Sequence, residues 1–342
     1  MALGLVLRLP ELDHVRFNED ETRKVEASCA YGGEELEMKS RRKDYMDEPL
    51  LRAFGRLHRE ATSALTILTW NVEQGGSKVE AIVEALQGPL RADLYALQEL
   101  DRSTRRSGYQ DLPEKIARQL GVDYVFGAEF EELAQGGAFE LPLQGQTILS
   151  RLPILHTRIL RFRHQPHNWG GWWKPRLAVF QPRRGGRMTL MAELQWDDSN
   201  LVFYNTHLES QASDYDRALQ MSEILNDLWL QYPPETPVII AGDLNTKEEH
   251  RSAVIRLLQA AEFHDVLETS PGAPYTSPKS KRRLDWIFAR NVQSHDARIH
   301  PRKAPGHFPV TSTISMVRNV ELKTDSSLPK ELQRGDGENH EG

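Results

Sequence analysis

Polar side chains follow several short apolar runs of the chain, at the points where predicted strands end. In an α/β sheet, such positions bring side chains from distant parts of the sequence to one pocket. Taken singly, each has an ordinary structural explanation, such as a turn cap, a salt bridge or a hydrogen-bonded core histidine. Taken together they favour a catalytic site, and they are Asn71, Glu99, His207, Asp243, Asn245, Asp285 and His307.

These side-chain types suit hydrolysis by an activated water beside a hard cation. A lone carboxylate after an apolar run, Glu99, suits Mg²⁺, which binds through few carboxylates and keeps its waters. Asp243 and Asn245 lie two residues apart on one side of an extended segment, so one can handle a proton or a water while the other donates to an anion. His207 and His307 can bind phosphate oxygens or move protons near neutral pH. No serine or cysteine lies in a nucleophile elbow, so a covalent mechanism is not indicated.

The elements that must position these side chains are short apolar runs bounded by turn or helix signals. Strands that alternate irregularly with helices favour a mixed α/β domain of roughly 250 residues. The expected strands lie at 65–70, 93–100, 146–150, 188–194, 201–208, 237–244, 284–289 and 308–315, and the expected helices at 77–90, 114–121, 217–231 and 252–263.

The two ends of the chain differ from this pattern. Residues 1–63 hold 11 basic and 13 acidic residues and few β-branched ones, which predicts a polar N-terminal extension. The last 24 residues, 319–342, hold 3 basic and 6 acidic residues and almost no large apolar ones, which predicts a disordered acidic tail. The main domain is therefore expected at 64–318. The extension is expected to end in one amphipathic helix after Pro49, because Leu50, Leu51, Phe54 and Leu57 recur at helical spacing.

Composition excludes several classes of protein. The 342 residues are 39% hydrophobic and 27% charged, which is ordinary for a globular chain and excludes collagen, a coiled coil and a wholly disordered protein. The single cysteine, Cys29, excludes an intrachain disulfide and a thiolate-rich zinc site and favours a reducing compartment, so we expect a cytoplasmic protein. Apolar runs fall short of the roughly 18 residues that a transmembrane helix needs, and no signal peptide is expected. Since the net charge is -6, contacts with phosphates must come from local patches.

The motifs that carry these residues occur in a familiar order. TWNVEQ, LQELD, NTHLES, IIAGDLNT, RRLDWIFAR and GHFPV together resemble the endonuclease/exonuclease/phosphatase family, which has the DNase I-like fold. The resemblance covers about residues 65–316, and GQTILSRLPI is similar to a further family segment. It implies a four-layered α/β-sandwich in which two mixed β-sheets pack face to face with helices outside. The site would then lie at one rim of the sandwich.

The resemblance implies a role for each residue that matches a family motif. Glu99 would bind Mg²⁺, with Mn²⁺ as a substitute, and Asn71 would help to hold the phosphate and the metal-site network. His207 would donate to a non-bridging phosphate oxygen and stabilise charge in the transition state. Asp243 would orient or deprotonate the attacking water, and Asn245 would bind the phosphate beside it.

The last two motifs supply a second candidate for the base and one departure from the family. Asp285 would fix the ring of His307, and the resemblance leaves open whether Asp243 or the Asp285–His307 pair is the base. The family usually has Ser-Asp-His where this chain has Pro305, Gly306 and His307. The missing carboxylate often assists at the metal site, so a second metal position is in doubt.

Two basic segments flank the catalytic motifs. Residues 156–187 hold 8 Lys/Arg, no acid and three tryptophans, and residues 279–303 hold 8 Lys/Arg against two aspartates. Basic loops with interleaved aromatics suit a nucleic-acid backbone with stacked bases, but tryptophans packed under a loop with solvated arginines would give the same pattern. Arg187 lies where family nucleases often place a phosphate-contacting arginine, so the resemblance implies that it binds substrate.

The leading hypothesis is a Mg²⁺-dependent phosphodiesterase, an endo- or exonuclease acting on DNA or RNA. The alternative is a phosphatase or phosphodiesterase for a small or lipid phosphoester, such as a phosphoinositide, sphingomyelin or a nucleotide-linked ester. A third reading, motivated by Gly306, is a catalytically quiet binding module. No protein partner can be inferred from the sequence.

Overall fold

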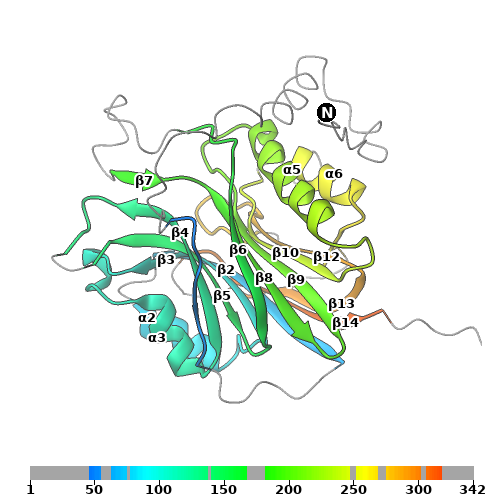
Figure 1. Ribbon diagram of the computed structural model, residues 1–342, viewed down its shortest axis with the longest axis horizontal. Helices are drawn as coiled ribbons and strands as arrows, with labels where there is room; N and C mark the ends of the chain where they lie inside the picture. The colour runs from blue at the N-terminus through cyan, green and yellow to red at the C-terminus, as the bar shows by residue number, and fades with distance from the viewer. Residues whose placement is uncertain are drawn as a thin grey trace, which may run out of the picture.

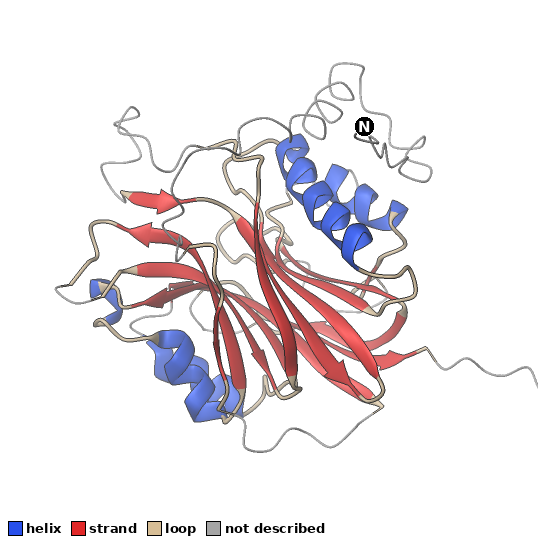
Figure 2. Ribbon diagram, viewed as in Figure 1, coloured by secondary structure: helices blue, strands red, loops and turns tan. Residues whose placement is uncertain are grey.

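Two β-sheets packed face to face form the centre of the molecule, with helices on their outer faces (Figures 1 and 2). A four-layered α/β-sandwich with two mixed sheets is therefore confirmed. No described helix has the length and apolar character needed to cross a membrane. The computed structural model describes residues 46–54, 63–74, 78–137, 140–167, 182–246, 252–268, 275–301 and 306–317.

The first sheet is antiparallel except where β2 and β3 pair in parallel. Strand β7 (Arg183–Gly185) pairs with β4 outside the main path. In spatial order the strands are β1 (Leu50–Arg52), β4 (Asp123–Glu132), β5 (Leu143–Ser150), β3 (Leu94–Arg102), β2 (Ala64–Gln74), β14 (Val310–Met316) and β13 (Val292–Ile299).

The second sheet is antiparallel except where β9 and β10 pair in parallel. In spatial order its strands are β11 (His264–Asp265), β12 (Asp285–Arg290), β10 (Val238–Asp243), β9 (Ser199–His207), β8 (Met188–Trp196) and β6 (Ile154–Arg161). Each sheet thus has one parallel pair, and the motifs TWN, LQE, NTH and GDLN lie at or near the carboxyl ends of those four strands.

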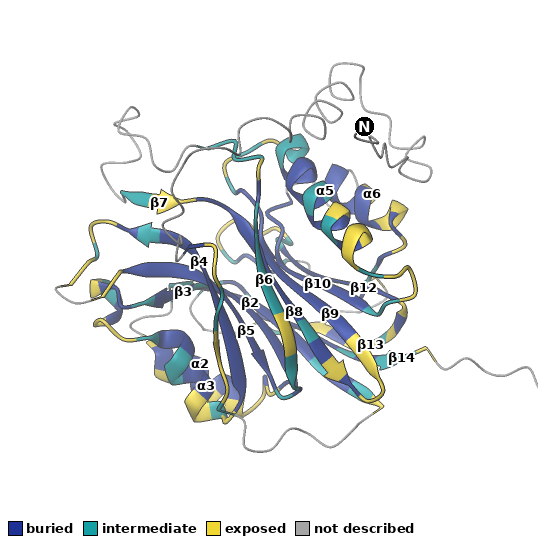
Figure 3. Ribbon diagram, viewed as in Figure 1, coloured by how far each residue is buried: buried dark blue, intermediate teal, exposed yellow. Residues whose placement is uncertain are grey.

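Three apolar layers hold the sandwich together. Residues such as Ile67, Leu190 and Phe203 fill the space between the two sheets. The helices α2 (Val79–Gln87) and α3 (Leu112–Leu120) cover the outer face of the first sheet. The helices α5 (Asp214–Gln231) and α6 (Ala253–Ala260) cover the outer face of the second, and a short 3₁₀ helix, η3, spans Arg105–Ser107. Because both faces of the central strands are covered, these strands are buried along most of their length, as Figure 3 shows.

Local signals set the ends of the helices. The side chain of Asp111 accepts a hydrogen bond from the backbone nitrogen of Glu114 at the start of α3, and Gly121 ends that helix in the left-handed conformation. A reciprocal capping box between Ser213 and Asp216 begins α5 directly after the NTHLES segment.

The eight strands and four helices predicted within the main domain are present, with ends within a few residues. The strands that the sequence did not reveal lie mostly at sheet edges, and β6 and β13 are half-exposed, so they lack a continuous apolar run. Position at an edge explains why hydrophobic pattern alone misses these strands, but the sequence also did not reveal β4, which lies inside the sheet and is mostly buried.

The segment after Pro49 corrects one expectation. The helical spacing there predicts a helix, but Leu50–Arg52 form strand β1, which pairs antiparallel with β4 from Leu50 opposite Phe126. The open edge of β4 supplies backbone partners, and the carboxylate of Asp123 accepts a hydrogen bond from the nitrogen of Phe54 at 2.7 Å. These tertiary contacts outweigh a weak helical pattern.

Several other expectations fall outside the described residues. They concern residues 1–45 and 55–62 of the extension, the tail from residue 318, and the basic, tryptophan-containing stretch at 168–181.

Candidate active site

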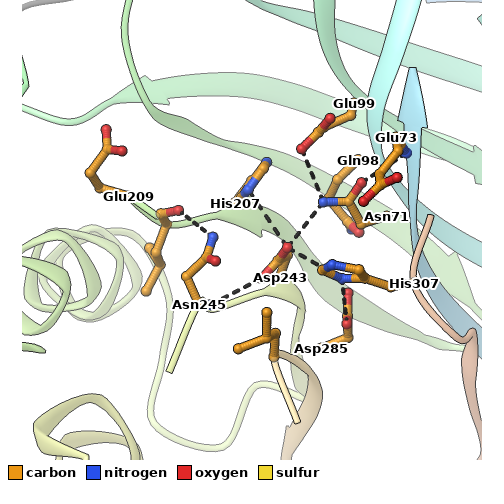
Figure 4. A network of polar contacts seen from close by, with 12 residues as sticks. Asn71, Glu73, Gln98, Glu99, His207, Glu209, Asp243, Asn245, Asp285 and His307 are labelled. Atoms are coloured by element: carbon orange, nitrogen blue, oxygen red, sulfur yellow. Dashed lines mark hydrogen bonds and ion pairs between the residues drawn. The ribbon is translucent and has the colours of Figure 1, made fainter. Parts of the chain in front are cut away.

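The carboxyl ends of the two parallel strand pairs meet at one rim of the sandwich and bring the predicted residues together (Figure 4). Asp243 at the end of β10 pairs with His207 at the end of β9 on one side and with Asp285 at the start of β12 on the other. From the facing sheet, β2 contributes Asn71 and β3 contributes Glu99. The six motifs therefore converge although the first and last lie more than 200 residues apart.

Asp243 lies at the centre of this cluster. Its Oδ1 accepts a hydrogen bond from the backbone nitrogen of Asn245 at 3.0 Å, and its Oδ2 accepts one from Nδ2 of Asn71 at 3.0 Å. The same Oδ2 lies 3.5 Å from Nδ1 of His307 and 3.7 Å from Nε2 of His207. Burial and the negative charge of Asp285 raise the pKa of Asp243 to about 7, against the lowering effect of His307.

His307 is held by a carboxylate on one ring nitrogen. Its Nδ1 lies 2.8 Å from Oδ2 of Asp285, and both side chains are buried. Burial alone would lower the pKa of His307, but the charges of Asp285 and Asp243 outweigh it and raise that pKa to about 10. The ring is then an imidazolium at neutral pH, and its Nε2–H is a charged donor.

Backbone contacts fix the loop that carries His307 against β2. The nitrogen of His307 donates to the carbonyl of Asn71 at 3.0 Å, and the indole of Trp70 donates to the carbonyl of His307 at 2.9 Å. On the other side, the hydroxyl of Thr276 accepts a hydrogen bond from the nitrogen of Asp285 at 3.0 Å. The Asp285–His307 pair is therefore anchored at both of its backbone positions.

Asn71 links the central carboxylate to Glu99. Its Nδ2 donates to Oε1 of Glu99 at 3.2 Å as well as to Asp243, while its Oδ1 accepts from the nitrogen of Glu73 at 3.0 Å. The oxygen and nitrogen of the Asn71 side chain are thus both engaged. Asn71 is therefore a fixed bridge between the two sheets.

Backbone irregularities aim Glu99 into the site. Glu99 has φ +59°, in the left-handed region that costs a non-glycine residue about 1 kcal/mol or more. The pairing of β3 with β5 shifts register between Leu97 and Leu100, and the pairing of β2 with β3 shifts after Asn71. Such bulges re-aim side chains beside active sites. Asn245 also has a positive φ, +50°, which asparagine tolerates well.

The donor set fits a divalent cation. Glu99 is partly exposed and its Oε1 accepts a hydrogen bond from Asn71, which leaves carboxylate lone pairs for a hydrated ion such as Mg²⁺. Within the described part of the chain, Asp243, Asp285 and His307 also each offer one ligand atom, and these atoms lie within 4.8 Å of one another. Carboxylate oxygens dominate both arrangements, as a hard cation requires.

Gly306 stands where the family usually has a carboxylate, and no side chain fits there. Its φ is +73°, and a Cβ at this position would overlap the carbonyl oxygen of Asn71 and crowd the carbonyl carbon of Val72. The loop has therefore closed onto β2 in a way that only glycine allows.

Arg187, predicted as a substrate contact, lies buried behind His207. Its Nη1 donates to Oε1 of Glu129 at 2.9 Å and lies 3.0 Å from Nδ1 of His207, while its Nε lies 3.7 Å from Oε2 of Glu209. Direct contact with a substrate would require the guanidinium to leave these partners.

Sequence reasoning missed Glu73, Glu129 and Glu209. Glu129 is a fully buried carboxylate in strand β4, but this strand holds three further acidic residues, so its sequence does not single Glu129 out. Glu73 follows Asn71 by two residues, and its Oε1 lies 2.8 Å from Nζ of Lys279 at the edge of the site. Glu209 lies within NTHLES, but its contact with Arg187 could be seen only in three dimensions.

Comparisons with known proteins agree with the geometry. A model described as the Endonuclease/Exonuclease/phosphatase family matches residues 68–311. Solved structures at low identity share the fold. One, an endonuclease/exonuclease/phosphatase from Beutenbergia cavernae, has a TM-score of 0.58 and 18% identity over 75% of this chain and 72% of its own.

Two further structures match this chain over the full length of their own chains. A Bacteroides vulgatus endonuclease/exonuclease/phosphatase has a TM-score of 0.56 and 13% identity over 75% of this chain. D. rerio TDP2, solved in complex with a single strand DNA product, has a TM-score of 0.52 and 19% identity over 75% of this chain. A search of curated proteins gave no match.

Proposed function

The chain belongs to the endonuclease/exonuclease/phosphatase family, and on that basis we propose that it is a Mg²⁺-dependent phosphodiesterase that cleaves nucleic acid, as an endo- or exonuclease. The observation that carries this proposal is the cluster centred on Asp243, in which a carboxylate with a raised pKa lies beside a protonated His307. A carboxylate whose pKa is raised to near neutrality, beside a histidine whose pKa is raised so that it keeps its proton, is typical of a base and an acid at one reacting centre.

Asp243 is the group best suited to activate the water. A base works best when its pKa is near the working pH, and the raised pKa of Asp243 meets that condition. His307 holds its proton at neutral pH, so it acts as a charged donor to phosphate rather than as the base. Of the two candidates for the base, this electrostatic arrangement supports Asp243.

Donors surround the position of the phosphate. Nε2 of His207 lies 3.7 Å from Oδ2 of Asp243, so its proton can reach a phosphate oxygen that sits beside this carboxylate. Asn245 is held in place because its Nδ2 donates to the carbonyl of Leu208 at 3.0 Å. Fixed donors of this kind stabilise charge that develops in the transition state.

Glu99 would hold the divalent cation, with Asn71 orienting its carboxylate. When bound, the cation supplies a Lewis acid that polarises a phosphoryl oxygen and a template that orients the ester. A Cβ at position 306 would clash with the backbone of β2, so the carboxylate proposed to hold the cation is that of Glu99.

A basic and aromatic surface beside His307 supports nucleic acid as the substrate. The ring of Phe308 stacks on that of Tyr275 at 5.6 Å, and Nζ of Lys281 lies 4.6 Å from the centre of the Tyr275 ring. Lys279, on the same turn as Tyr275 and Lys281, lies next to Glu73 of β2. Aromatic platforms with nearby cations bind stacked bases and backbone phosphates. A structural neighbour, D. rerio TDP2, was solved with a single strand DNA product.

The second candidate is a phosphatase or phosphodiesterase for a small or lipid phosphoester. The net charge of -6 favours it, because a long polyanion is repelled by a negative protein outside its local contacts.

The test is nicking of supercoiled plasmid with Mg²⁺ or Mn²⁺, against EDTA and an Asp243→Ala variant. Asp198→Ala, which removes an exposed aspartate between β8 and β9, is the matched control. We expect metal-dependent nicking by the wild type and the control and none by Asp243→Ala. Hydrolysis of a small aryl phosphodiester without nicking would support the second candidate, and no turnover of either substrate would contradict a hydrolase.

A further inference from the structure

A buried guanidinium faces the ring nitrogen of His207 that points away from the site. Arg187 exposes 6% of its side chain, and Glu129 and Glu209 beside it are fully buried. Nη1 of Arg187 carries two protons, and its two near partners are Oε1 of Glu129 at 2.9 Å and Nδ1 of His207 at 3.0 Å.

This contact determines which ring nitrogen of His207 carries the proton. A guanidinium only donates hydrogen bonds, so Nδ1 can take part only as an acceptor and must be unprotonated. The single proton of the neutral ring then lies on Nε2, the nitrogen that faces Asp243 at 3.7 Å. The opposite tautomer would direct a proton from Nδ1 toward Arg187, while the nearest oxygen of Glu129 lies at 4.0 Å, beyond hydrogen-bonding distance.

We propose that Arg187 is a positioning residue for His207: it accommodates only the tautomer protonated on Nε2 and thereby aims a neutral hydrogen-bond donor at the phosphate. The tautomer follows from contacts within this chain, and the part of the proposal that concerns phosphate rests on the proposed function. Histidines are more often oriented by a carboxylate or carbonyl that accepts from Nδ1, so a donor at that place is the distinguishing feature.

The two carboxylates keep Arg187 in place. A buried guanidinium is stable only with anionic partners, and Glu129 at 2.9 Å and Glu209 at 3.7 Å supply them. Burial, and after it the charge of Arg187, also holds the pKa of His207 well below its usual range, so the ring stays neutral. Glu129, Glu209 and Arg187 are thus one unit behind His207.

Arg183 provides a matched control. Its guanidinium, like that of Arg187, lies over the ring of Phe130, at 4.4 Å against 5.5 Å. Its carboxylate partner is Glu132 at 2.8 Å, and no contact of Arg183 with a ring nitrogen of His207 is found in the described part of the chain. Its removal therefore tests the loss of a buried arginine without the loss of the donor to His207.

The experiment is long-range proton–nitrogen NMR of the full chain labelled with ¹⁵N-histidine, recorded without substrate. The chain has 12 histidines, so the signals of His207 are assigned by their loss in His207→Gln. We expect a neutral ring protonated on Nε2 in the wild type and in Arg183→Met, and loss of this single form in Arg187→Met. A His207 protonated on Nδ1 in the wild type would overturn the proposal, whether or not any variant folds.

Two variants address folding and chemistry. Arg187→Met/Glu129→Gln removes the nearer of the two carboxylate charges that Arg187→Met would leave without the guanidinium. Arg187→Gln keeps an N–H donor and is expected to restore the tautomer. The NMR spectra of these two variants do not depend on turnover, so they test the tautomer of His207 even if the proposed function is wrong.

Kinetics separate positioning from direct contact with substrate. Arg187→Met should lower kcat by about 100-fold or more with little change in KM, since one transition-state donor is misplaced. In a His207→Gln background it should cause no further loss. An undiminished loss in that background, or a raised KM, would mean that Arg187 binds substrate itself and would contradict positioning through His207.

Discussion

At the residue scale, the chemistry depends on Asp285 acting on two neighbours at once. Its charge raises the pKa of His307, on which burial acts in the opposite direction, and adds to the effect of burial on Asp243. A single buried carboxylate therefore sets the protonation of both the proposed base and the proposed acid. This coupling makes the pH profile a sensitive probe of the site.

The Asp285→Asn variant should move both limbs of the pH profile of kcat/KM to lower pH. In the wild type, we expect activity to rise as Asp243 loses its proton near pH 7 and to fall as His307 loses its proton near pH 10. Removing the negative charge lowers both pKa values, because that charge favours the protonated form of each group. The measurement is kcat/KM on a small phosphodiester across both limbs. An alkaline limb that stays in place would contradict the assignment of His307 as the acid.

Gly306 gives a prediction about stability. Gly306→Ala should cost about 2 kcal/mol or more, since a left-handed backbone and a clash with the carbonyl of Asn71 act together. Gly121, with φ +64° and open space around it, is the control, and Gly121→Ala should cost only about 1 kcal/mol. Urea unfolding of the two variants measures the difference, and equal losses would show that the loop at Gly306 adapts. For the same reason, Gly306→Asp cannot restore a metal-site carboxylate without moving the loop.

At the element scale, the turn between Tyr275 and Leu284 joins the basic surface to the catalytic pair. The hydroxyl of Thr276 on this turn holds the nitrogens of both Leu284 and Asp285, and the nitrogen of Phe308 donates to the carbonyl of Thr276 at 2.6 Å. The backbone of the turn that carries the aromatic and cationic side chains is thus held beside His307.

Lys281→Ala should weaken binding of single-stranded DNA and lower the slope of log affinity against log salt by about 1, because one phosphate contact is lost. Lys115→Ala, on helix α3 where Lys115 pairs with Glu80, is the control and should leave the slope unchanged. Fluorescence anisotropy in EDTA at several salt concentrations gives both slopes. An unchanged slope for Lys281→Ala would remove this turn from the substrate surface.

The strand elements also show where sequence patterns stop being informative. The runs that end in Asn71, Glu99, His207 and Asp243 are apolar because both faces of those strands are covered, so pattern alone locates them. Strand β1 was missed because its conformation depends on the free edge of β4, about 70 residues further along the chain. Pairing with the edge of a distant strand produces no recognisable hydrophobic pattern in so short a segment.

At the scale of the whole molecule, the two sheets must stay packed for Asn71 and Glu99 to face Asp243. A cation held by Glu99 binds the folded protein and not the unfolded chain, so it should add to the free energy of unfolding. Bound Mg²⁺ is therefore a probe of the assembled site.

Mg²⁺ at about 100 times its Kd should stabilise the wild type by about 2.7 kcal/mol and raise its Tm, and this rise should be lost in Glu99→Gln. Glu84→Gln, on the exposed face of α2, is the matched control and should keep the rise. Thermal unfolding with Mg²⁺ and with EDTA measures the effect. A rise that persists in Glu99→Gln would place the cation elsewhere.

The sequence by itself determined the α/β class, the order of the main apolar strands and helices, and seven of the side chains at the rim, while the four-layered sandwich followed from the family resemblance. Apolar runs and the polar residues that end them are local features, so they can be read without knowing which strands pair. The arrangement of Arg187, Glu129 and His207 could be decided only by tertiary structure, because Glu129 and His207 come from strands of different sheets and Arg187 from the residues just before β8, so their contacts depend on how the sheets face each other. The same holds for Gly306, where the crowding comes from the backbone of β2 more than 200 residues earlier in the chain. Packing of the two sheets brings the separate motifs together, and the contacts that result set the protonation state of each side chain in the site.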